Sequence, residues 1–474
     1  MVFNSLPFAV FLPLVFCGYW FLFQRDVKAQ NLFVVFASYF FYGWWDWRFL
    51  VLIALSTLVD FFVGQKLTTA NGPRRKWLLA CSLLFNLGLL GFFKYCNFFI
   101  DSATSALNAM GVAANPTSLN LILPVGISFY TFQTLSYTID VYREKIEPCK
   151  DLVSFAAYVS FFPQLVAGPI ERATNLLPQF YRSRQFDTEQ AKDGLRQILW
   201  GLLKKVVIAD NCAGVVNRIF ENYETLPASA LVLGAIYFAF QIYGDFSGYS
   251  DIAIGTAKLF GFDLMRNFAY PYFSRDIAEF WRRWHISLST WFREYVYVPL
   301  GGSRGSRAAQ FRNVLIVFVV SGLWHGANWT FVFWGLLNGL FFLPLMFAGS
   351  NRRNLDTVAA GKLLPSTREA AQILLTFGLT CLAWIFFRAE SISHAFDYIV
   401  RIFDVSLFSR PEGIRTLPLC LAMLCVEWIQ REKAHALEVT GQPVAVRWAI
   451  YYAVIAAIIA LGEFGHHEFI YFQF

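Results

Sequence analysis

The 474-residue sequence has few charged residues, and this shortage is its first informative property. Lys, Arg, Asp and Glu together make up 15% of the chain, whereas soluble domains carry about 25%. Hydrophobic residues reach 57% and aromatic residues 19%. A soluble protein of this composition would expose apolar patches large enough to aggregate. The composition therefore excludes a disordered, collagenous or ordinary cytosolic chain and predicts a polytopic membrane protein.

Several common signatures of catalysis and binding are also missing. The sequence has no G-x-x-x-x-G-K-[ST] loop, no G-x-S-x-G elbow and no H-E-x-x-H helix, and its 8 cysteines form no C-x-x-C pair. The net charge of +7 is modest and no basic run alternates with aromatic residues, so we expect no nucleic-acid partner. His466, His467 and Glu468 could bind a metal, but a lone adjacent histidine pair is more typical of a solvated chain end. We therefore expect no metal site.

Apolar runs long enough to cross a bilayer, which needs about 20 residues, recur along the chain. The predicted spans are residues 5–23, 31–47, 49–64, 77–99, 120–141, 228–245, 313–328, 329–347, 370–387, 413–429 and 444–462. Pro163, Gly168 and Pro169 predict a broken or re-entrant segment over 152–170. Residues 194–216 hold Lys204, Lys205 and Asp210 in an otherwise apolar pattern and predict an amphipathic or partly buried helix. We expect one all-α membrane domain over 1–474, with about eleven transmembrane helices plus re-entrant and interfacial helices.

The basic residues predict the orientation of the chain. Loops 65–76 and 143–151 are rich in Lys and Arg, whereas loop 101–118 has neither. Because cytoplasmic loops carry the excess of basic residues, we expect a periplasmic N-terminus. Segment 266–312 contains eight arginines and is expected on the cytoplasmic surface.

A stretch with helical spacing of large apolar side chains carries the first candidate residue, His285. The spacing of 3, 4, 3 and 4 residues predicts one interfacial helix with a broad aromatic face, formed by Trp281, Trp284, Leu288, Trp291 and Tyr295. Arg282, Arg283 and Arg293 lie away from this face, toward lipid phosphate or the phosphates of a ligand. His285 falls at the border of the two faces, in line with Ser289 and Arg293. A histidine without any chemistry at the interface is an equally good interpretation.

His325 is the second candidate, because residues 314–347 contain no Lys, Arg, Asp or Glu. An ionisable residue at membrane depth is costly, so it indicates function; the alternative is a histidine that only hydrogen-bonds between helices. The Gly322-x-x-x-Gly326 and Gly335-x-x-x-Gly339 spacings favour close helix packing. A neutral imidazole at this depth suits a general base, and Trp324 and Asn328 adjoin it.

A polar cluster, residues 245–251, follows another apolar run and includes Asp245 and Tyr249. Its Asp and Ser side chains could cap a helix that begins near Ile252. A structural role of this kind is at least as good an interpretation as a catalytic one.

Together these motifs resemble the membrane-bound O-acyltransferase (MBOAT) family, close to its alginate O-acetyltransferase branch. The most specific pair is Glu279-Phe-Trp-Arg-Arg-Trp-His-Ile-Ser-Leu-Ser289 and Gly322-Leu-Trp-His-Gly-Ala-Asn328. Weaker matches are Ala37-Ser-Tyr-Phe-Phe-Tyr42, Leu123-Pro-Val-Gly-Ile-Ser-Phe-Tyr130, Ala167-Gly-Pro-Ile170, Asp245-Phe-Ser-Gly-Tyr-Ser-Asp251 and Phe469-Ile-Tyr-Phe-Gln-Phe474.

The resemblance implies a fold and an activity. The family's paired histidines fall on His285 and His325, and the fold is a ring of tilted and broken helices around a central funnel or tunnel. The implied donor is cytoplasmic acetyl-CoA, with no bound cofactor. The acetyl group is passed to periplasmic partner proteins, which modify a polysaccharide such as alginate. The implied location is the bacterial inner membrane.

The roles of single residues follow as hypotheses. His325 is expected to be the base, and His285 to position the donor or to polarise its carbonyl. Arg282, Arg283 and Arg293 could bind the phosphates of coenzyme A. Trp324, Asn328, Asp245 and Tyr249 are expected to line the tunnel or to be structural.

Three alternatives to this function stay open. The acceptor could be peptidoglycan or another envelope polymer. The chain could instead transfer D-alanine from a carrier protein. It could also be a transporter of a lipid-linked saccharide, although no internal repeat of the kind common in transporters is found.

Overall fold

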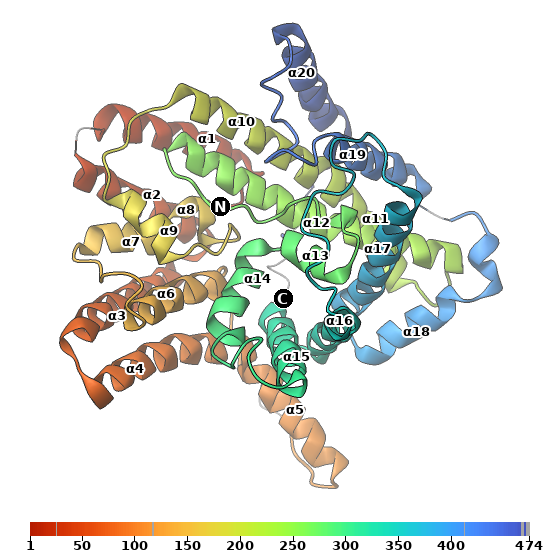
Figure 1. Cartoon of the computed structure of the whole chain (residues 1–474), viewed down its shortest axis with the longest axis horizontal. Helices are drawn as coiled ribbons and strands as arrows, with labels where there is room; N and C mark the ends of the chain where they lie inside the picture. The colour runs from red at the N-terminus through yellow and green to blue at the C-terminus, as the bar shows by residue number, and fades with distance from the viewer. Residues whose placement is uncertain (25, 116–117, 412, 466–468, 471–474) are drawn as a thin grey trace. The chain divides into compact units, whose positions relative to one another are not determined.

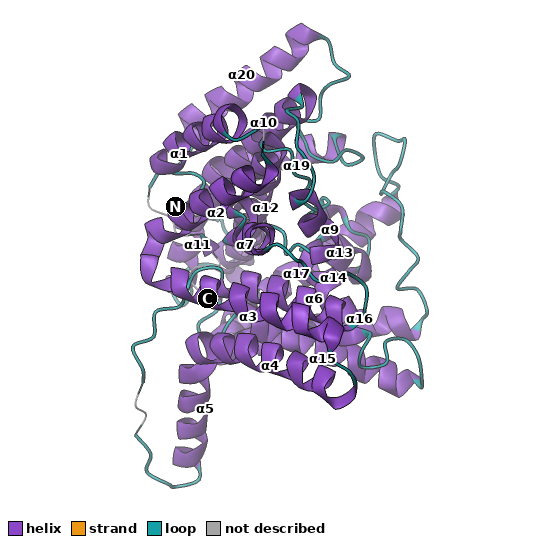
Figure 2. Ribbon diagram, turned by 90° about the vertical axis from the view of Figure 1, so that its left-hand side faces the viewer, coloured by secondary structure: helices purple, strands orange, loops and turns teal. Residues whose placement is uncertain are grey.

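Helices and the loops between them account for the described residues, with no strand among them (Figure 2). The computed structural model describes residues 1–24, 26–115, 118–411, 413–465 and 469–470. By its internal contacts the chain divides into two compact units. Unit 1 comprises Met1–Thr188 and Ala257–Leu264, and unit 2 comprises Glu189–Thr256 and Met265–Phe474. The all-α prediction is confirmed.

Several helices of unit 1 begin at side-chain caps or prolines. Ser5 accepts a hydrogen bond from the Phe8 N–H at the start of the first helix, and Asp26 accepts one from Lys28 at the second, as expected for N-cap residues. The described α-helices of unit 1 are α1 (Leu6–Cys17), α2 (Val27–Asp46), α3 (Leu50–Thr69), α4 (Gly72–Leu90), α5 (Cys96–Ala109), α6 (Ile127–Tyr142), α7 (Leu152–Ser160), α8 (Phe162–Leu165) and α9 (Ala173–Leu176).

Asp60 forms a polar centre inside unit 1, on α3. Its side chain is fully buried and accepts hydrogen bonds from Ser82 (2.5 Å), Asn86 (2.8 Å) and Thr138 (3.1 Å). These partners belong to α4 and α6. Because a buried carboxylate is costly unless hydrogen-bonded, Asp60 favours one packing of α3, α4 and α6.

The predicted broken segment is present. Residues 152–170 form α7 and α8, with a break at Phe161 (φ −50°, ψ 106°), and the backbone from 166 to 170 is non-helical but buried. The predicted span 120–141 begins later than expected, because α6 starts at Ile127 after the left-handed Gly126 (φ 76°).

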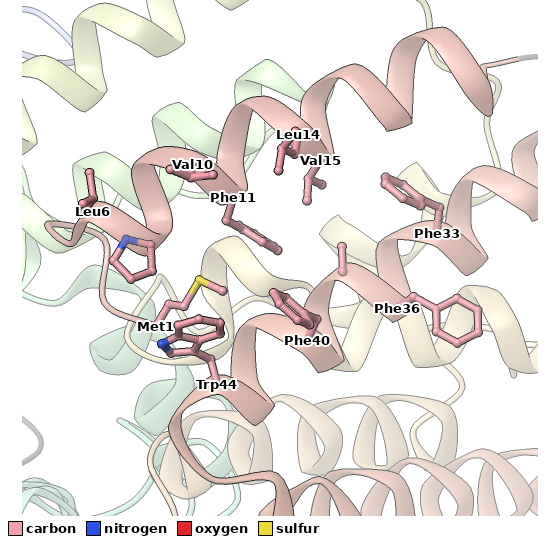
Figure 3. A pocket seen from close by; sticks show the side chains of 12 residues that line it. Met1, Leu6, Val10, Phe11, Leu14, Val15, Phe33, Phe36, Phe40 and Trp44 are labelled. Atoms are coloured by element: carbon pink, nitrogen blue, oxygen red, sulfur yellow. The ribbon is translucent and has the colours of Figure 1, made fainter.

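An open apolar groove runs between α1 and α2 (Figure 3). Phe11, Leu14 and Val15 of α1 face Phe33 and Phe40 of α2 across a cavity of about 700 Å³. Its apolar lining is typical of a surface that lies against lipid tails.

Unit 2 contains the two candidate histidines. Its α-helices are α10 (Thr188–Leu202), α11 (Asp210–Glu221), α12 (Ala228–Leu259), α13 (Ile277–Arg283), α14 (Ile286–Phe292), α15 (Arg307–His325), α16 (Trp329–Phe347), α17 (Thr367–Arg388), α18 (Ile392–Ile402), α19 (Leu417–Ile429) and α20 (Val444–Leu461). A π-helical stretch, Leu203–Ala209, joins α10 to α11, as predicted for a helix over 194–216.

Two lysines of this π-helical stretch are buried and paired with α12. The Lys204 ammonium lies 2.6 Å from the Asp251 carboxylate, and that of Lys205 lies 2.9 Å from Asp245 and 2.8 Å from Asp210. These ion pairs offset the cost of burying the two lysine charges. The segment can therefore be partly buried, as predicted.

Six helical segments of the described residues are long and apolar enough to cross a membrane. They are Val27–Thr69, Gly72–Ala109, Ala228–Leu259, Trp329–Phe347, Thr367–Arg388 and Val444–Leu461. One of them, Val27–Thr69, joins two stretches that the sequence predicted as separate spans, 31–47 and 49–64. The chain is therefore a multi-pass membrane protein, and the count of eleven stays a prediction.

Candidate active site

His285 sits at a break between two short helices, α13 and α14, which the sequence analysis predicted as one continuous helix. This prediction is wrong: the backbone at His285 turns left-handed (φ 43°, ψ 53°). The break is fixed from outside the segment, because the carbonyl of Asn267 accepts the Ile286 N–H at 2.9 Å. His285 is the N-cap of α14 and its carbonyl accepts the Ser289 N–H at 3.0 Å, but its side chain is fully buried whereas that of Arg293 is exposed.

The His285 ring is fully buried and contacts Asn267 directly. Its Nδ1 lies 3.1 Å from the Asn267 side-chain oxygen and 3.4 Å from the Ser287 hydroxyl. Phe246 of α12 meets the ring edge-on, with ring centroids 4.6 Å apart. His285 lies outside the candidate spans, and its burial lowers the pKa of the imidazole to about 3. The ring is therefore neutral at physiological pH.

His325 is the last residue of α15, and it is 3% exposed. The C-terminal end of a helix presents backbone carbonyls and favours nearby positive charge. An imidazole at this place can therefore accept a proton during a reaction at lower cost.

A close hairpin of α15 and α16 positions His325 (Figure 1). A Cβ added to Gly322 would clash with the Phe331 carbonyl, and one on Gly335 would clash with the Phe318 carbonyl. The two glycines also approach each other, since a Cβ on Gly335 would lie 3.2 Å from the Gly322 Cα. Close packing predicted from the glycine spacing is thus confirmed for this pair.

The structure brings the two predicted histidines together. Their ring centroids are 6.3 Å apart, although 40 positions separate them in the sequence. Trp324 packs against both, at 6.0 Å from His285 and 5.0 Å from His325. The structure therefore places the two motif histidines next to each other. Their catalytic roles stay predictions.

Aromatic side chains enclose the pair. Trp334 and Phe387 lie 5.1 Å and 5.5 Å from the His325 ring. Trp384 stacks on Trp334 at 5.4 Å and touches Trp284 at 5.1 Å. Such walls exclude water, and electrostatic interactions are stronger in a dry site than in solution.

The three candidate arginines separate in the structure. Arg282 donates to the carbonyls of Asn351 (2.9 Å) and Asn354 (2.7 Å), so it ties α13 to the loop after α16. Arg283 pairs with Glu279 at 2.9 Å. Arg293 differs, because its side chain is 65% exposed and lies 3.4 Å from Glu294.

Arg293 also borders a cavity of about 510 Å³, which Arg352 and Gln310 line from other segments. Phe318 forms part of its wall and contacts Trp281, with ring centroids 5.4 Å apart. Trp281 in turn contacts Trp334, which adjoins His325. A polar, arginine-bearing cavity therefore lies a few aromatic side chains away from the histidine pair.

The remaining predicted residues have structural partners. Asn328 caps α16 by accepting the Thr330 N–H and donates to the Glu390 carbonyl. The expected helix start near Ile252 is wrong, because α12 continues through the cluster without a break. Asp245 pairs with Lys205 and accepts the Ile470 N–H.

Tyr249 is buried, and its ring lies 4.6 Å from that of Phe469. Residues 471–474 of the C-terminal motif lie outside the described part of the chain, as do His466, His467 and Glu468. Among the described residues, no group of three His, Cys, Asp or Glu side chains is placed to hold a metal.

Two buried polar residues in this part of unit 2 escaped the sequence analysis. Asn267 is fully buried against His285, and no periodicity marks it. Glu427 is a buried acid whose two oxygens each lie 2.9 Å from the Tyr243 hydroxyl. The sequence could have indicated Glu427, because it is the single charged residue in the apolar run 417–429.

Comparison of the sequence with known proteins matches the chain to one family. The MBOAT, membrane-bound O-acyltransferase, sequence model matches residues 150–386, which include both histidines. The chain is 40% identical over 397 residues to a probable alginate O-acetylase AlgI of Pseudomonas syringae pv. tomato (83% of this chain, 73% of the relative). It is 38% identical over 458 residues to a probable alginate O-acetylase AlgI of Azotobacter vinelandii (94% and 88%). It is 37% identical over 426 residues to a peptidoglycan O-acetyltransferase of Helicobacter pylori (83% and 78%). The chain belongs to the membrane-bound O-acyltransferase family and is an acyltransferase.

Proposed function

We propose that this protein takes an acetyl group from cytoplasmic acetyl-CoA and passes it across the membrane for O-acetylation of an extracellular polysaccharide such as alginate. The observation that carries the proposal is the buried pair of His285 and His325 inside the region that matches the family. Relatives named as alginate O-acetylases support the acetyl group and the polysaccharide. We place the protein in the bacterial inner membrane, with a periplasmic N-terminus and periplasmic proteins as acetyl-accepting partners.

The chemistry needs a base and a polarised carbonyl. The acceptor hydroxyl attacks the thioester carbon, the C–O bond forms, the C–S bond breaks, and coenzyme A leaves as a thiolate that takes up a proton. His325 accepts the hydroxyl proton, helped by the carbonyl end of α15. His285 positions the donor or polarises its carbonyl.

The cavity beside Arg293 supports a donor that carries phosphates. Arg293 and Arg352 line it together, and guanidinium groups bind phosphate by charge-assisted hydrogen bonds. Changing both to alanine is expected to raise the KM for acetyl-CoA and to leave kcat nearly unchanged.

The test is transfer of labelled acetyl groups from acetyl-CoA in membranes that contain the periplasmic partners. His325→Ala at normal protein level is expected to lose about 10²-fold or more in rate, the usual contribution of a positioned base. His285→Asn is the better variant at the other position, because asparagine tolerates the left-handed backbone. His394→Ala is the matched control, since His394 stacks on Tyr223 in another part of unit 2.

Three results would contradict the proposal. Full activity of His325→Ala would exclude its role as base. Label supplied as D-alanine on a carrier protein, but not as acetyl-CoA, would favour the D-alanyl alternative. Net movement of a lipid-linked saccharide without labelled polymer would indicate a transporter.

A further inference from the structure

Asn267 is the residue whose contacts with His285 go beyond packing. Its side chain is fully buried in the segment between α12 and α13. Its side-chain oxygen receives three groups from the turn that carries His285: the Ser287 N–H (3.3 Å), the Ser287 hydroxyl (2.9 Å) and His285 Nδ1 (3.1 Å). Its amide nitrogen donates to Ser250 of α12 at 3.0 Å.

These contacts decide which way the Asn267 amide points. The backbone N–H of Ser287 can only donate, so the atom that it contacts is the oxygen. Ser250 accepts from the other side of the amide and fits the same orientation. An amide oxygen is only an acceptor. His285 Nδ1 must therefore carry a proton to donate to it.

A neutral imidazole has one protonated and one unprotonated nitrogen. With the proton on Nδ1, the lone pair of His285 lies on Nε2. A ring in this state accepts a hydrogen bond or a proton at Nε2, and it cannot donate one to a carbonyl oxygen there.

We propose that Asn267 is a positioning residue that holds His285 as the Nδ1–H tautomer, so that Nε2 is the acceptor atom of the site. The proposal rests on the proposed acetyl transfer and chooses between the two roles left open for His285. His285 positions a donor or acceptor group by accepting its N–H or O–H, and it does not polarise the thioester carbonyl.

The surroundings of His285 support a fixed tautomer. Phe246, Phe268 and Trp324 contact the ring from α12, the preceding segment and α15. Among the described residues, the ring of His325 from α15 also faces it, with ring centroids 6.3 Å apart. A charged partner introduced at 267 would lie at hydrogen-bond distance from the His285 Nδ1.

The first experiment reads the tautomer without using activity. The purified chain labelled with ¹⁵N-histidine is compared with His285→Asn by NMR, which assigns the His285 signals by their loss. We expect a protonated Nδ1 and an unprotonated Nε2 in the unchanged protein. A protonated Nε2 at neutral pH would overturn the inference, whether or not the enzyme transfers acetyl groups.

The second experiment uses the near-isosteric Asn267→Asp. A carboxylate at this distance favours the charged ring, and opposite charges at such range shift a pKa by about one to three units. The acidic limb of the pH–rate profile should move upward by about that amount. Asn267→Ala should lower kcat about 10²-fold. An Asn267→Asp profile that superimposes on the unchanged enzyme would refute the proposal.

Asn313→Ala is the matched control, because Asn313 is also fully buried and donates to the Leu300 and Gly302 carbonyls. It should lower thermal stability and leave the pH profile in place. If the unchanged protein transfers no acetyl group, the proposed function fails, and the NMR comparison still decides the role of Asn267.

Discussion

Replacing Gly335 by alanine adds one methyl group at the close approach of α15 and α16. The new Cβ would lie 3.0 Å from the Phe318 carbonyl carbon and 3.2 Å from the Gly322 Cα, and it would also clash with the Phe318 oxygen. Carbon atoms in contact prefer about 3.5–4.0 Å. The helices must therefore separate by roughly 0.5–1 Å, because the obstacles are backbone atoms that cannot rotate away.

Two consequences follow for Gly335→Ala. Overpacking of this kind costs about 1–3 kcal/mol, so the thermal midpoint of the purified protein should fall. A displacement of about 1 Å at a reacting group can cost about 10²-fold in rate, and His325 ends the displaced helix. We therefore expect labelled-acetyl transfer to fall by one to two orders of magnitude at equal protein level.

Gly378→Ala is the control for helix propensity. Gly378 lies inside α17, and apart from its own stretch of helix no heavy atom of the described residues lies within 4 Å of the position that a Cβ would take there. The change should therefore be neutral or stabilise by up to about 1 kcal/mol. Unchanged activity and stability in Gly335→Ala would refute the inference that the close approach of Gly322 and Gly335 fixes the position of His325.

Two further predictions concern buried charge. Glu279→Ala leaves Arg275 and Arg283 without their shared buried carboxylate. Breaking such a pair costs about 3–5 kcal/mol, so the thermal midpoint should fall sharply. A midpoint within experimental error of the unchanged protein would contradict this prediction. His285 has a folded pKa of about 3 against about 6.5 unfolded, so below pH 6.5 the unfolded chain binds a proton that the folded site does not. Stability should fall by about 1.4 kcal/mol per pH unit from 6.5 downward and be independent of His285 above it; thermal unfolding from pH 5 to 8 should show a steeper loss than in His285→Asn.

The sequence predicted the parts of the site that depend on local pattern. Burial of His325 follows from an uncharged apolar run, and its close helix partner follows from glycine spacing. The break at His285 could not be predicted in the same way. Helical periodicity continues through it, and the partner that fixes the turn, Asn267, lies 18 residues earlier.

A similar limit explains the error at residues 245–251. Polar side chains in that cluster indicated a helix end, because an acid inside an apolar helix has no local partner. Lys204 and Lys205 supply partners from another helix, so α12 continues. Tertiary pairing of this kind leaves no trace in the local sequence.

The lysine pairs also bear on the order in which the chain is assembled. Lys204 is synthesised 47 residues before Asp251, its partner on α12, whereas Lys205 has a nearer partner in Asp210 besides Asp245. An unpaired lysine is expensive to bury. Lys204 is therefore costly to bury in its final place until α12 has been synthesised. We therefore expect the segment around Lys204 to complete its packing only after α12 has been made.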